Sequence, residues 1–410
     1  MARTIHVIGA GLAGLAAAVR LSGRGERVVV HEALQQAGGR CRSYYDASTG
    51  LTIDNGNHLL LSGNHAALSY LRALGSDAGL LGPASADFPF IDLASKERWT
   101  VRINDGRLPW WIFDASRRIP GTTFLDYLAF TPLLWASKDK TVGEVMSCGG
   151  PLYQRLGHPL LLAALNIDPP QGSAVLAGAI VRETLLAGGS ACRPLIAHGL
   201  TEVFIDPALH LLKERGAEVN FGHQLHAFGF GDGLVSSLDF GTERVALEPG
   251  DAVILAVPPW IAPSLLPGVS VPSEYRAIVN AHFRIDPPAD FPRMIGVLNA
   301  TVEWIFGFEN RLSVTISGAD RLLNAPREEL ARTIWREVAQ VAGLSGDLPP
   351  WQIVRERRAT FAATPAENKK RPGPKTAWRN LFLAGDWTDT GLPATIEGAI
   401  RSGDRAAELT

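Results

Sequence analysis

Short apolar runs alternate with stretches of helical pattern at both ends of the chain. The run from Thr4 to Ile8 is followed by the Ala- and Leu-rich stretch from Leu12 to Leu21 and then by the apolar run from Arg27 to His31. This order predicts strand, helix and strand. Near the other end, Asn380 to Gly385 predicts a short strand and Pro393 to Arg401 a helix. We therefore expect an α/β fold whose sheet is assembled from distant segments.

The middle of the chain carries two other patterns. From Gln224 to Val257, short stretches of alternating polarity are interrupted by turn residues such as the Gly-Asp-Gly at 231–233. This predicts an antiparallel meander that leads into a strand starting at Asp251. Helical runs such as Phe124 to Ala136 and Arg327 to Ala342 lie in stretches rich in aromatic and aliphatic residues.

These patterns divide the chain into two expected domains. The α/β signals fall in three separated segments, and the aromatic-rich stretches fall in two. The expected α/β domain comprises residues 1–75, 190–270 and 355–410, and the expected inserted α+β domain, which would bind the substrate, comprises residues 76–189 and 271–354. A chain of 410 residues is long enough for two domains of ordinary size.

A glycine-rich turn joins the first predicted strand to the first predicted helix. Gly9 permits the tight turn, Gly11 lets the backbone approach a pyrophosphate, and Gly14 lets the helix pack closely on the strand. The second strand leads to Glu32, where a carboxylate accepts hydrogen bonds from a ribose 2′-hydroxyl and repels a 2′-phosphate. The sequence therefore predicts a dinucleotide site and disfavours NADP.

The segment that follows points to FAD rather than to a nicotinamide cofactor. Residues 36–43 read QAGGRCRS. Gly38 and Gly39 allow close backbone contact, while Arg40 and Arg42 offer guanidinium groups to phosphate or to flavin carbonyls. This extension is typical of FAD proteins.

The predicted strand near the C-terminus ends at Gly385 and Asp386. A carboxylate here would accept a hydrogen bond from a ribose or ribityl hydroxyl. The helix expected to begin near Pro393 would direct its positive end at the flavin pyrimidine ring, where it would stabilise negative charge on a reduced flavin. An ordinary turn before a capped helix is the alternative.

Composition excludes several classes of protein. Hydrophobic residues make up 46% of the chain and the net charge is −2, which gives no electrostatic case for nucleic-acid binding. Cys41, Cys148 and Cys192 are too widely spaced for a metal pattern or a disulfide framework, so we expect no metal site. No signal peptide precedes the first strand, and no apolar stretch reaches the roughly 20 residues that span a bilayer. We expect a cytoplasmic protein that is able to lie on the inner face of a membrane.

One aromatic segment keeps two explanations open. Leu108 to Phe113 read LPWWIF and stand between Arg107 on one side and Arg117 and Arg118 on the other. Amphipathic aromatic residues beside arginines suit contact with a membrane surface. A buried edge strand with two core tryptophans explains the segment equally well.

A second aromatic pattern occurs further along the chain. Trp304, Phe306 and Phe308 alternate along a predicted strand and so share one face of it. They line a substrate tunnel or fill the domain core, and core packing is the favoured explanation because aromatic strands are usually buried.

Taken together, these motifs resemble the FAD-dependent amine oxidase and phytoene desaturase superfamily. The segments that carry this resemblance are GAGLAGL at 9–15, AGGRCRS at 37–43, DAVILAVPP at 251–259 and LAGDWTDTGLPATIEGAIRSG at 383–403. More narrowly, four other segments are similar to the hydroxysqualene dehydroxylases, also called squalene-associated FAD-dependent desaturases. These are DNGNHLLLSGN at 54–64, GRLPWW at 106–111, PLLLAALN at 159–166 and VNAHF at 279–283.

The resemblance implies a Rossmann-like (GR2-type) FAD domain and assigns its residues. Gly9, Gly11, Gly14 and Glu32 match the adenosine and pyrophosphate site, Gly39 and Arg40 the GGR motif, and Gly385 and Asp386 the late FAD-binding motif. Leu225 occupies the strand position whose backbone usually meets the adenine. FAD is expected to be noncovalent, because neither Cys nor His stands among residues 387–390, and the absence of Lys from Glu214 to Asn368 argues against amine oxidation.

The narrower resemblance also implies a reaction. Reduced FAD would deliver a hydride from N5 to the carbinol carbon of hydroxysqualene as water leaves, giving squalene for hopanoid synthesis. The upstream squalene-pathway synthases are then the expected functional partners. Departure of water needs a general acid, for which His58 and His282 are the candidates. Asp54 more simply fixes the local backbone. Trp304, Phe306 and Trp387 are the residues expected to line the substrate site.

Two alternatives stay open at this point. Within the enzymes, oxidised FAD would instead remove a hydride from a carotenoid precursor, acting as a desaturase. From another class, the chain would be a flavin-stabilised isoprenoid carrier without turnover. Product analysis with reduced and oxidised enzyme separates these possibilities.

Overall fold

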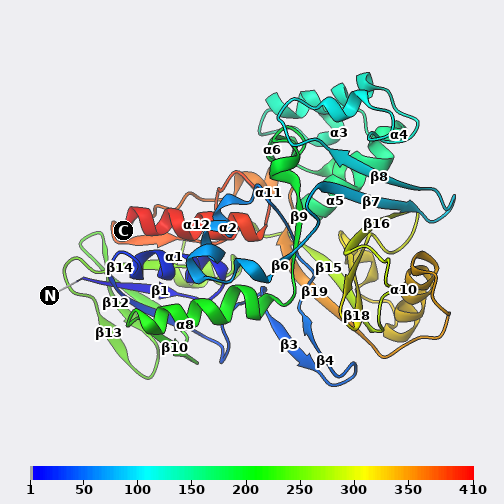
Figure 1. The fold of residues 1–410 in the computed structure, drawn as a ribbon. Helices are drawn as coiled ribbons and strands as arrows, with labels where there is room; N and C mark the ends of the chain where they lie inside the picture. Colours follow the sequence, from blue (N-terminus) through cyan, green and yellow to red (C-terminus); the bar gives the residue numbers. More distant parts are fainter. Residues whose placement is uncertain (1–2) are drawn as a thin grey trace.

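A five-stranded parallel sheet brings the two ends of the chain side by side (Figure 1). The computed structural model describes residues 3–410. The strand order is β10-β2-β1-β14-β20, and all four pairings are parallel. The strands are β1 (Thr4–Ile8), β2 (Arg27–Glu32), β10 (Glu218–Phe221), β14 (Ala252–Leu255) and β20 (Leu381–Leu383). The expectation of an α/β sheet built from distant segments is confirmed.

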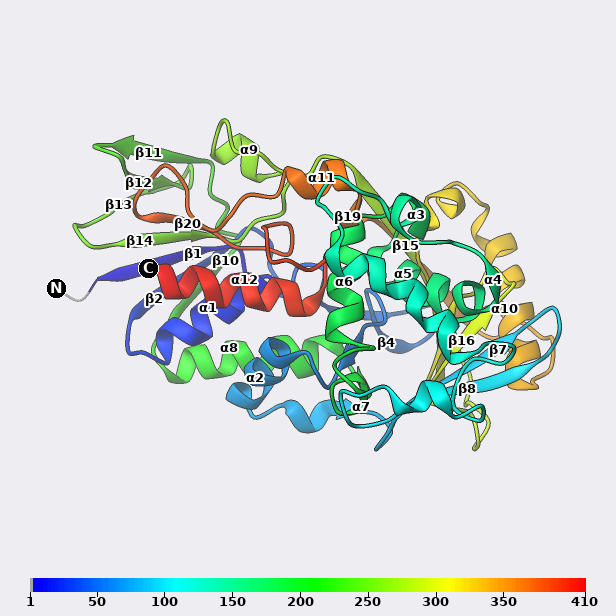
Figure 2. The same cartoon turned by 90° about the horizontal axis from the view of Figure 1, so that it is seen from above.

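Helices cover one side of this sheet and an antiparallel sheet covers the other (Figure 2). The helices are α1 (Leu12–Ser22), α2 (His65–Leu74), α8 (Asp206–Glu214) and α12 (Ile396–Leu409). A Cβ atom on Gly403 would lie 2.1 Å from the Ala13 carbonyl oxygen, so only glycine lets α1 and α12 pack this closely. The second sheet is the predicted meander, with strands β11 (Ala227–Gly231), β12 (Leu234–Asp239) and β13 (Arg244–Ala246).

A seven-stranded mixed sheet forms the other half of the molecule. Its order is β19-β15-β18-β17-β16-β7-β8, and β16 with β7 is its one parallel pairing. The strands are β7 (Ala86–Asp92), β8 (Arg98–Ile103), β15 (Tyr275–Arg284), β16 (Met294–Leu298), β17 (Trp304–Phe308), β18 (Arg311–Ile316) and β19 (Trp351–Phe361). Helix α10 (Arg327–Ala342), with the bounds that the sequence predicts, packs its apolar side against one face of this sheet.

Shorter elements connect and cap the two large sheets. They are β3 (Ser43–Asp46), β4 (Leu51–Asp54), β5 (Leu59–Leu61), β6 (Leu80–Leu81), β9 (Pro194–Ala197), α3 (Val142–Val145), α4 (Gly150–Leu152), α5 (His158–Leu165), α6 (Ala174–Glu183), α7 (Gly189–Cys192), α9 (Ala262–Leu265) and α11 (Pro365–Lys369). The predicted helical run from Phe124 is a 3₁₀ segment, Phe124–Trp135, which contains Pro132. None of the helices within residues 3–410 is both long and apolar enough to cross a membrane.

The expected division into two domains stays a prediction. The strands of the parallel sheet fall within the segments expected for the α/β domain. In the seven-stranded sheet, β19 crosses the expected boundary at 354/355, because it pairs with β15 as far as Phe361 opposite Tyr275. The long strand thus joins both expected domains.

Of the two explanations for Leu108 to Phe113, the edge strand is wrong. Trp110–Phe113 is a 3₁₀ turn, because the Asn104 side chain accepts a hydrogen bond from the Trp111 amide at 3.0 Å and donates to the Leu108 carbonyl at 3.0 Å. Trp111 is buried, whereas Trp110 is 65% exposed. Only one of the two tryptophans therefore belongs to the core.

One predicted boundary and one predicted strand position near the cofactor motifs are also wrong. The C-terminal helix begins at Ile396 rather than near Pro393, because the Thr395 hydroxyl caps it by accepting a hydrogen bond from the Gly398 amide at 3.0 Å. Leu225 lies in the connection between β10 and β11 rather than in a strand, although its side chain is buried as a core residue.

Candidate cofactor and substrate site

The glycine turn after β1 leaves one surface of its backbone open. Gly9 has φ +106°, and a Cβ atom there would lie 2.6 Å from the Ala256 carbonyl oxygen. A Cβ atom on Gly14 would lie 1.9 Å from the Gly9 carbonyl oxygen. On Gly11, by contrast, a Cβ atom would meet nothing within 4 Å. Gly9 and Gly14 therefore serve internal packing, while Gly11 exposes the backbone at the start of α1, where an anion is favoured.

The second glycine pair lies directly against this turn. The Gly38 amide donates to the Ala10 carbonyl at 2.8 Å, and a Cβ atom on Gly39 would lie 3.7 Å from the Gly11 Cα. Arg42 donates to the Gly39 carbonyl at 2.5 Å. The fold thus brings the glycine turn, which the sequence assigns to the pyrophosphate, next to the segment whose arginines it assigns to phosphate or flavin carbonyls.

Glu32 stands at the edge of the same turn. Its carboxylate accepts hydrogen bonds from the amides of Ala10 at 2.8 Å and Leu34 at 2.9 Å. Its carbonyl accepts from the amide of His223 at 2.8 Å, which fixes the connection that contains Leu225 beside it. The residues expected to hold adenosine therefore lie close together. The local sequence pattern does not predict that Leu225 stands in a connecting segment beside Glu32.

Arg40 and Asp386 join the N-terminal and C-terminal motifs. Arg40 Nη2 donates to Asp386 Oδ1 at 2.7 Å, and its Nη1 donates to the Ala359 carbonyl at 2.6 Å. The Asp386 carboxylate is buried and the Arg40 guanidinium is partly buried. The pair closes the site at the end of β20.

Replacing Asp386 by Ala is expected to weaken both folding and cofactor retention, since Arg40 would keep a partly buried charge without its partner. The expected loss of unfolding free energy is about 2 kcal/mol, below that of a fully buried pair. Urea unfolding of the apoprotein and flavin content after gel filtration measure the two effects. Asp389→Ala is the matched control, because Asp389 is exposed in the same loop. Equal behaviour of the two variants would contradict the assignment.

One face of the seven-stranded sheet carries an aromatic stripe beside a polar stripe. In the register, Trp304 lies opposite Thr315 and Phe306 opposite Ser313. On the far side of β18, Asn280 lies opposite Thr315 and His282 opposite Ser313. Register partners share a face, so the aromatic residues of β17 adjoin the polar residues of β18 and β15. Both aromatic side chains are buried, as expected for core packing.

The aromatic stripe continues across the sheet because Gly296 leaves room for rings. A Cβ atom there would lie 2.4 Å from the Phe90 ring and 3.2 Å from Trp304. The Phe90 ring centroid lies 5.5 Å from that of Trp304 and 5.7 Å from that of Trp99. This face is therefore apolar from β17 to β8.

The polar stripe meets the segment that follows β4. Asn280 Nδ2 donates to the Asn55 carbonyl at 3.4 Å, and Asn57 Nδ2 donates to Thr315 Oγ1 at 3.1 Å. Asn57 Oδ1 is buried without a hydrogen-bond partner among the described residues. The segment that includes His58 is thus brought to the same face as His282.

The two histidines are neutral at neutral pH. His282 is fully buried, and its Nδ1 lies 2.9 Å from Ser313 Oγ. Burial, helped by the charge of Arg311, lowers the pKa of His282 to about 3. Burial and the charge of Arg40 lower the pKa of His58 to about 4. A Cβ atom on Gly56 would lie 3.8 Å from His58 Nε2 and 3.2 Å from Asn280 Nδ2, which places His58 near β15.

Trp387 is fixed beneath the late motif. Its Nε1 donates to the Val257 carbonyl at 2.9 Å, and a Cβ atom on Gly385, which has φ +146°, would lie 2.4 Å from that nitrogen. The indole is almost completely covered by protein atoms. Its role in lining the substrate site stays a prediction.

Comparison with known proteins places these features in a family. The model of the flavin containing amine oxidoreductases matches residues 12–409. The chain belongs to this family. It is 63% identical to the hydroxysqualene dehydroxylase of Rhodopseudomonas palustris and 59% identical to that of Sinorhizobium fredii, in each case over 100% of this chain and 98% of the relative. In fold, it matches cyclohexylamine oxidase from Brevibacterium oxydans with a TM-score of 0.73 and 16% identity, over 100% of this chain and 98% of that one.

Membership of the flavin-containing amine oxidoreductase family implies a flavin, and the residues present fit this group. The open backbone at Gly11, the neighbouring Gly39 and the carboxylates of Glu32 and Asp386 form a continuous set of donors and acceptors. Within residues 3–410, no group of three or more His, Cys, Asp or Glu residues is placed to hold a metal ion.

Arg371 is a member of the site that sequence reasoning missed. It is buried and donates to the carbonyls of Asp386 at 3.2 Å and Thr388 at 2.5 Å, and to Thr390 Oγ1 at 3.0 Å. Burial lowers its pKa to about 10, so it stays charged at neutral pH. An arginine in an irregular segment is not part of a periodic sequence pattern, so the sequence does not predict its role. Its hydrogen-bond partners come from the loop that follows Asp386 and folds over it.

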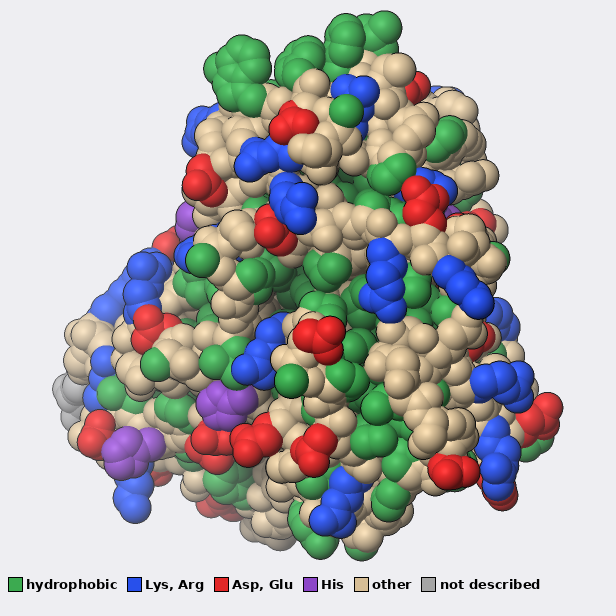
Figure 3. All heavy atoms as spheres, turned by 45° about the vertical axis from the view of Figure 1, so that its right-hand side comes forward, with side chains coloured by type: hydrophobic (Ala, Val, Ile, Leu, Met, Phe, Trp, Pro, Cys, Tyr) green, Lys and Arg blue, Asp and Glu red, His purple; other side chains and the backbone are tan. Residues whose placement is uncertain are grey.

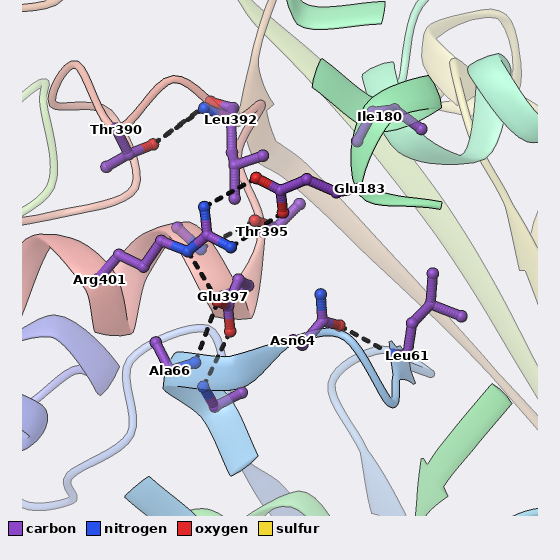
Figure 4. Close-up of polar contacts among 12 residues, drawn as sticks. Leu61, Asn64, Ala66, Ile180, Glu183, Thr390, Leu392, Thr395, Glu397 and Arg401 are labelled. Atoms are coloured by element: carbon purple, nitrogen blue, oxygen red, sulfur yellow. Dashed lines mark hydrogen bonds and ion pairs between the residues drawn. The ribbon is translucent and has the colours of Figure 1, made fainter. Parts of the chain in front are cut away.

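A second missed network fixes the start of α12 (Figure 4). The Glu397 carboxylate accepts hydrogen bonds from the amides of Ala66 at 3.1 Å and Ala67 at 2.8 Å, at the first turn of α2. Arg401 donates to Glu397 at 2.7 Å and, through two bonds of 2.9 Å, to Glu183 at the end of α6. Three segments far apart in the sequence are therefore joined where α12 begins.

Proposed function

We propose that this chain reductively removes the hydroxyl group of hydroxysqualene to give squalene, with noncovalently bound FAD. The observation that carries this proposal is the identity of 63% and 59%, over the whole chain, to two hydroxysqualene dehydroxylases. The chain then acts in squalene and hopanoid synthesis, downstream of the synthases that supply the alcohol. We further propose that it works in the cytoplasm, against the inner face of the membrane.

The residues around the glycine turn would hold the cofactor. We assign the pyrophosphate to the backbone of Gly11 and Gly39, the adenosine ribose to Glu32 and the adenine to the backbone at Leu225. Asp386, with Arg40 beside it, would accept a hydroxyl hydrogen bond. Gly9, Gly14 and Gly385 shape the backbone, while the turn through Pro393 leads to the N-terminus of α12, whose partial positive charge would face the flavin.

Noncovalent binding is supported by the side chains near the late motif. Trp387, Thr388, Asp389 and Thr390 follow Asp386, and none of them forms the cysteinyl or histidyl links that flavins use. Cys41, which lies next to Arg40, is buried, and burial raises the pKa of its thiol. A protonated, enclosed thiol is a poor nucleophile.

When bound, FAD supplies the hydride that replaces the hydroxyl group. The chain has to orient a long isoprenoid and exclude water around it. We propose that Trp304, Phe306 and Trp387 provide the apolar surface for this. The neighbouring polar stripe of β15 and β18 is the place where the single hydroxyl group of the substrate would find hydrogen-bond partners.

Loss of the hydroxyl group as water consumes one proton, for which we propose His58 and His282 as candidate donors. A group with a pKa near 4 carries its proton in only a small fraction of molecules at pH 7. Below pH 7, this fraction rises about tenfold for each pH unit until the pKa is reached. If either histidine donates, the rate of dehydroxylation should rise as the pH falls.

Single-turnover rates between pH 7.5 and about 5.5 test the donor assignment. We expect a rise of about tenfold per pH unit in the unmodified protein, and loss of this slope in His58→Gln or in His282→Gln. The variant that keeps the slope is not the donor. A flat profile in the unmodified protein would contradict both assignments, provided that its flavin content is constant over the range.

Product analysis tests the proposed reaction. Enzyme kept reduced by dithionite and given hydroxysqualene should form squalene, and oxidised enzyme given phytoene should leave it unchanged. A longer chromophore in the second incubation would instead identify a carotenoid-precursor desaturase. Tight binding of the hydrocarbon without any turnover would identify a carrier.

A further inference from the structure

A cluster of exposed apolar side chains projects from one end of the molecule. Seven of the fifteen large hydrophobic residues that are exposed within residues 3–410 lie between positions 108 and 135. They are Leu108, Trp110, Phe113, Phe124, Leu125, Leu128 and Trp135, here called the apolar patch. Figure 3 shows hydrophobic side chains projecting at the top of the molecule, the end where Figure 1 shows the segment coloured cyan. Such a concentration marks an interaction surface.

The scaffold beneath the apolar patch is well fixed. The Trp111 ring packs edge-on against Tyr127 with centroids 5.0 Å apart, and the Tyr127 hydroxyl accepts a hydrogen bond from the Ile119 amide at 2.9 Å. A capping box formed by Thr123 and Asp126 begins the 3₁₀ segment. The exposed rings are therefore held outward by a folded support.

Three rings of the apolar patch lie next to one another. The Phe113 ring centroid lies 6.1 Å from that of Trp110 and 5.2 Å from that of Phe124. Trp135 is 80% exposed at the other end of the segment. Tryptophan and phenylalanine with this arrangement are the side chains that enter the boundary between lipid headgroups and acyl chains.

A groove rich in arginine adjoins the apolar patch. It has a volume of about 510 Å³, and the residues that line it include Arg98, Arg102, Arg118, Ser116 and Trp99, with no carboxylate among them. Residues 115–120, which form one wall, connect Phe113 to Phe124. The loop at 115–120 thus links the groove to the apolar patch along the chain.

The arginines retain free donors for an anion. Arg118 Nη1 donates to the Ile112 carbonyl at 3.3 Å and Arg98 Nη2 to the Val341 carbonyl at 2.6 Å, so each uses one group. Arg102 Nε forms a long ion pair with the Asp87 carboxylate at 3.9 Å, without a hydrogen bond. Guanidinium groups match the geometry of phosphate oxygens. Asp114 and Asp126 of the same segment accept hydrogen bonds from local amides.

We propose that this end of the molecule docks onto a bilayer that contains acidic phospholipids. The apolar patch enters the bilayer boundary, and the arginine groove receives the phosphate of one lipid headgroup. The biological role of this docking rests on the proposed function, because a long isoprenoid alcohol dissolves in the bilayer and the enzyme would take it up there. The docking itself is tested without substrate.

Vesicle sedimentation of the full-length holoprotein tests this docking. Vesicles of phosphatidylcholine alone and of phosphatidylcholine with one quarter phosphatidylglycerol provide the two surfaces. We expect tighter binding to the acidic vesicles, loss of binding to both kinds in Trp110→Ser/Phe113→Ser/Trp135→Ser, and loss of only the acidic increment in Arg102→Gln/Arg118→Gln. The expected increment is about tenfold in affinity for the two arginines, and it should fall with added salt.

Tyr45→Ser/Phe221→Ser is the control, because both side chains are exposed and lie outside the apolar patch. Flavin content and melting temperature verify that each variant is folded. The proposal would be overturned if the triple variant bound vesicles as well as the unmodified protein does. It would also be overturned if the unmodified protein bound no vesicles but formed concentration-dependent dimers that the triple substitution abolishes. Dehydroxylation of detergent-dispersed substrate is measured in parallel, so that failure of the proposed function is distinguishable from failure of docking.

Discussion

Replacing Gly11 by Val is expected to abolish retention of FAD while leaving the apoprotein folded. The protein without cofactor has space for a side chain at Gly11, because a Cβ atom there would meet nothing within 4 Å. The φ of −75° is also one that Val adopts without strain. The valine would therefore stand where a pyrophosphate approaches the backbone, and loss of two charge-assisted hydrogen bonds weakens affinity by about 100-fold or more.

Titration of the apoprotein with FAD, followed by fluorescence, measures this change. Gly231→Val is the matched control, because Gly231 is exposed at the end of β11 and a Cβ atom there would also meet nothing within 4 Å. The urea midpoints of both variants should stay close to that of the unmodified protein. Normal FAD affinity in Gly11→Val would contradict the location of the cofactor site.

Replacing Arg311 by Met is expected to cost about 3 kcal/mol of unfolding free energy at pH 7. Arg311 and Asp54 are both buried, with Nη2 3.5 Å from the carboxylate, and Arg311 also donates to the Thr52 carbonyl at 3.0 Å. The methionine would fill similar volume but leave the charge of Asp54 uncompensated. The segment from Asp54 to His58 should then lose its fixed position against β15.

The pH dependence of this loss follows from Asp54. Burial raises the pKa of this carboxyl group above its ordinary value, and removal of Arg311 should raise it further. A raised pKa in the folded state favours the protonated form, so stability is regained as the pH falls through it. The deficit of Arg311→Met should accordingly be smaller at pH 5 than at pH 7, as measured by urea unfolding.

The double variant Asp54→Asn/Arg311→Met is the control for this interaction. Since it removes both charges, it should be more stable than Arg311→Met alone. A double variant that is less stable than the single one, or a deficit that grows towards pH 5, would contradict the assigned role of the pair.

The parts of the fold that could be predicted from sequence are those fixed by local pattern. The apolar run at Thr4–Ile8, the glycine turn after it and the amphipathic helix Arg327–Ala342 each carry their signal within a few turns of chain. The pairing of Arg40 with Asp386 was not predicted, although both residues were assigned to the cofactor, because it depends on how the two ends of the chain meet.

The missed residues act through long-range contacts. Arg371 stands in an irregular segment, Arg311 begins strand β18 and Glu397 lies in the first turn of α12. Their partners are distant in sequence or are backbone carbonyls and amides. The helix start near Pro393 was misplaced because proline at the first turn is a common signal, whereas here the Thr395 hydroxyl makes the cap.

The aromatic segment at Leu108 to Phe113 shows a different limit. Its composition is compatible with both a core strand and a membrane-contacting segment. The segment forms a 3₁₀ turn because the Asn104 side chain hydrogen-bonds to the Leu108 carbonyl and the Trp111 amide. Trp111 is then buried in the core, whereas Trp110 is exposed, and contact of the segment with a membrane stays a proposal. Composition alone contains no information on which tryptophan turns inward.

An anaerobic single-turnover experiment tests the proposed reaction most directly. The holoprotein is reduced, mixed with one equivalent of hydroxysqualene in detergent and followed by flavin absorbance, and the hydrocarbon is then identified by mass spectrometry. We predict reoxidation of the flavin matched one-to-one by squalene. A flavin that stays reduced, with the alcohol unchanged, would contradict the proposal that this chain is a reductive dehydroxylase.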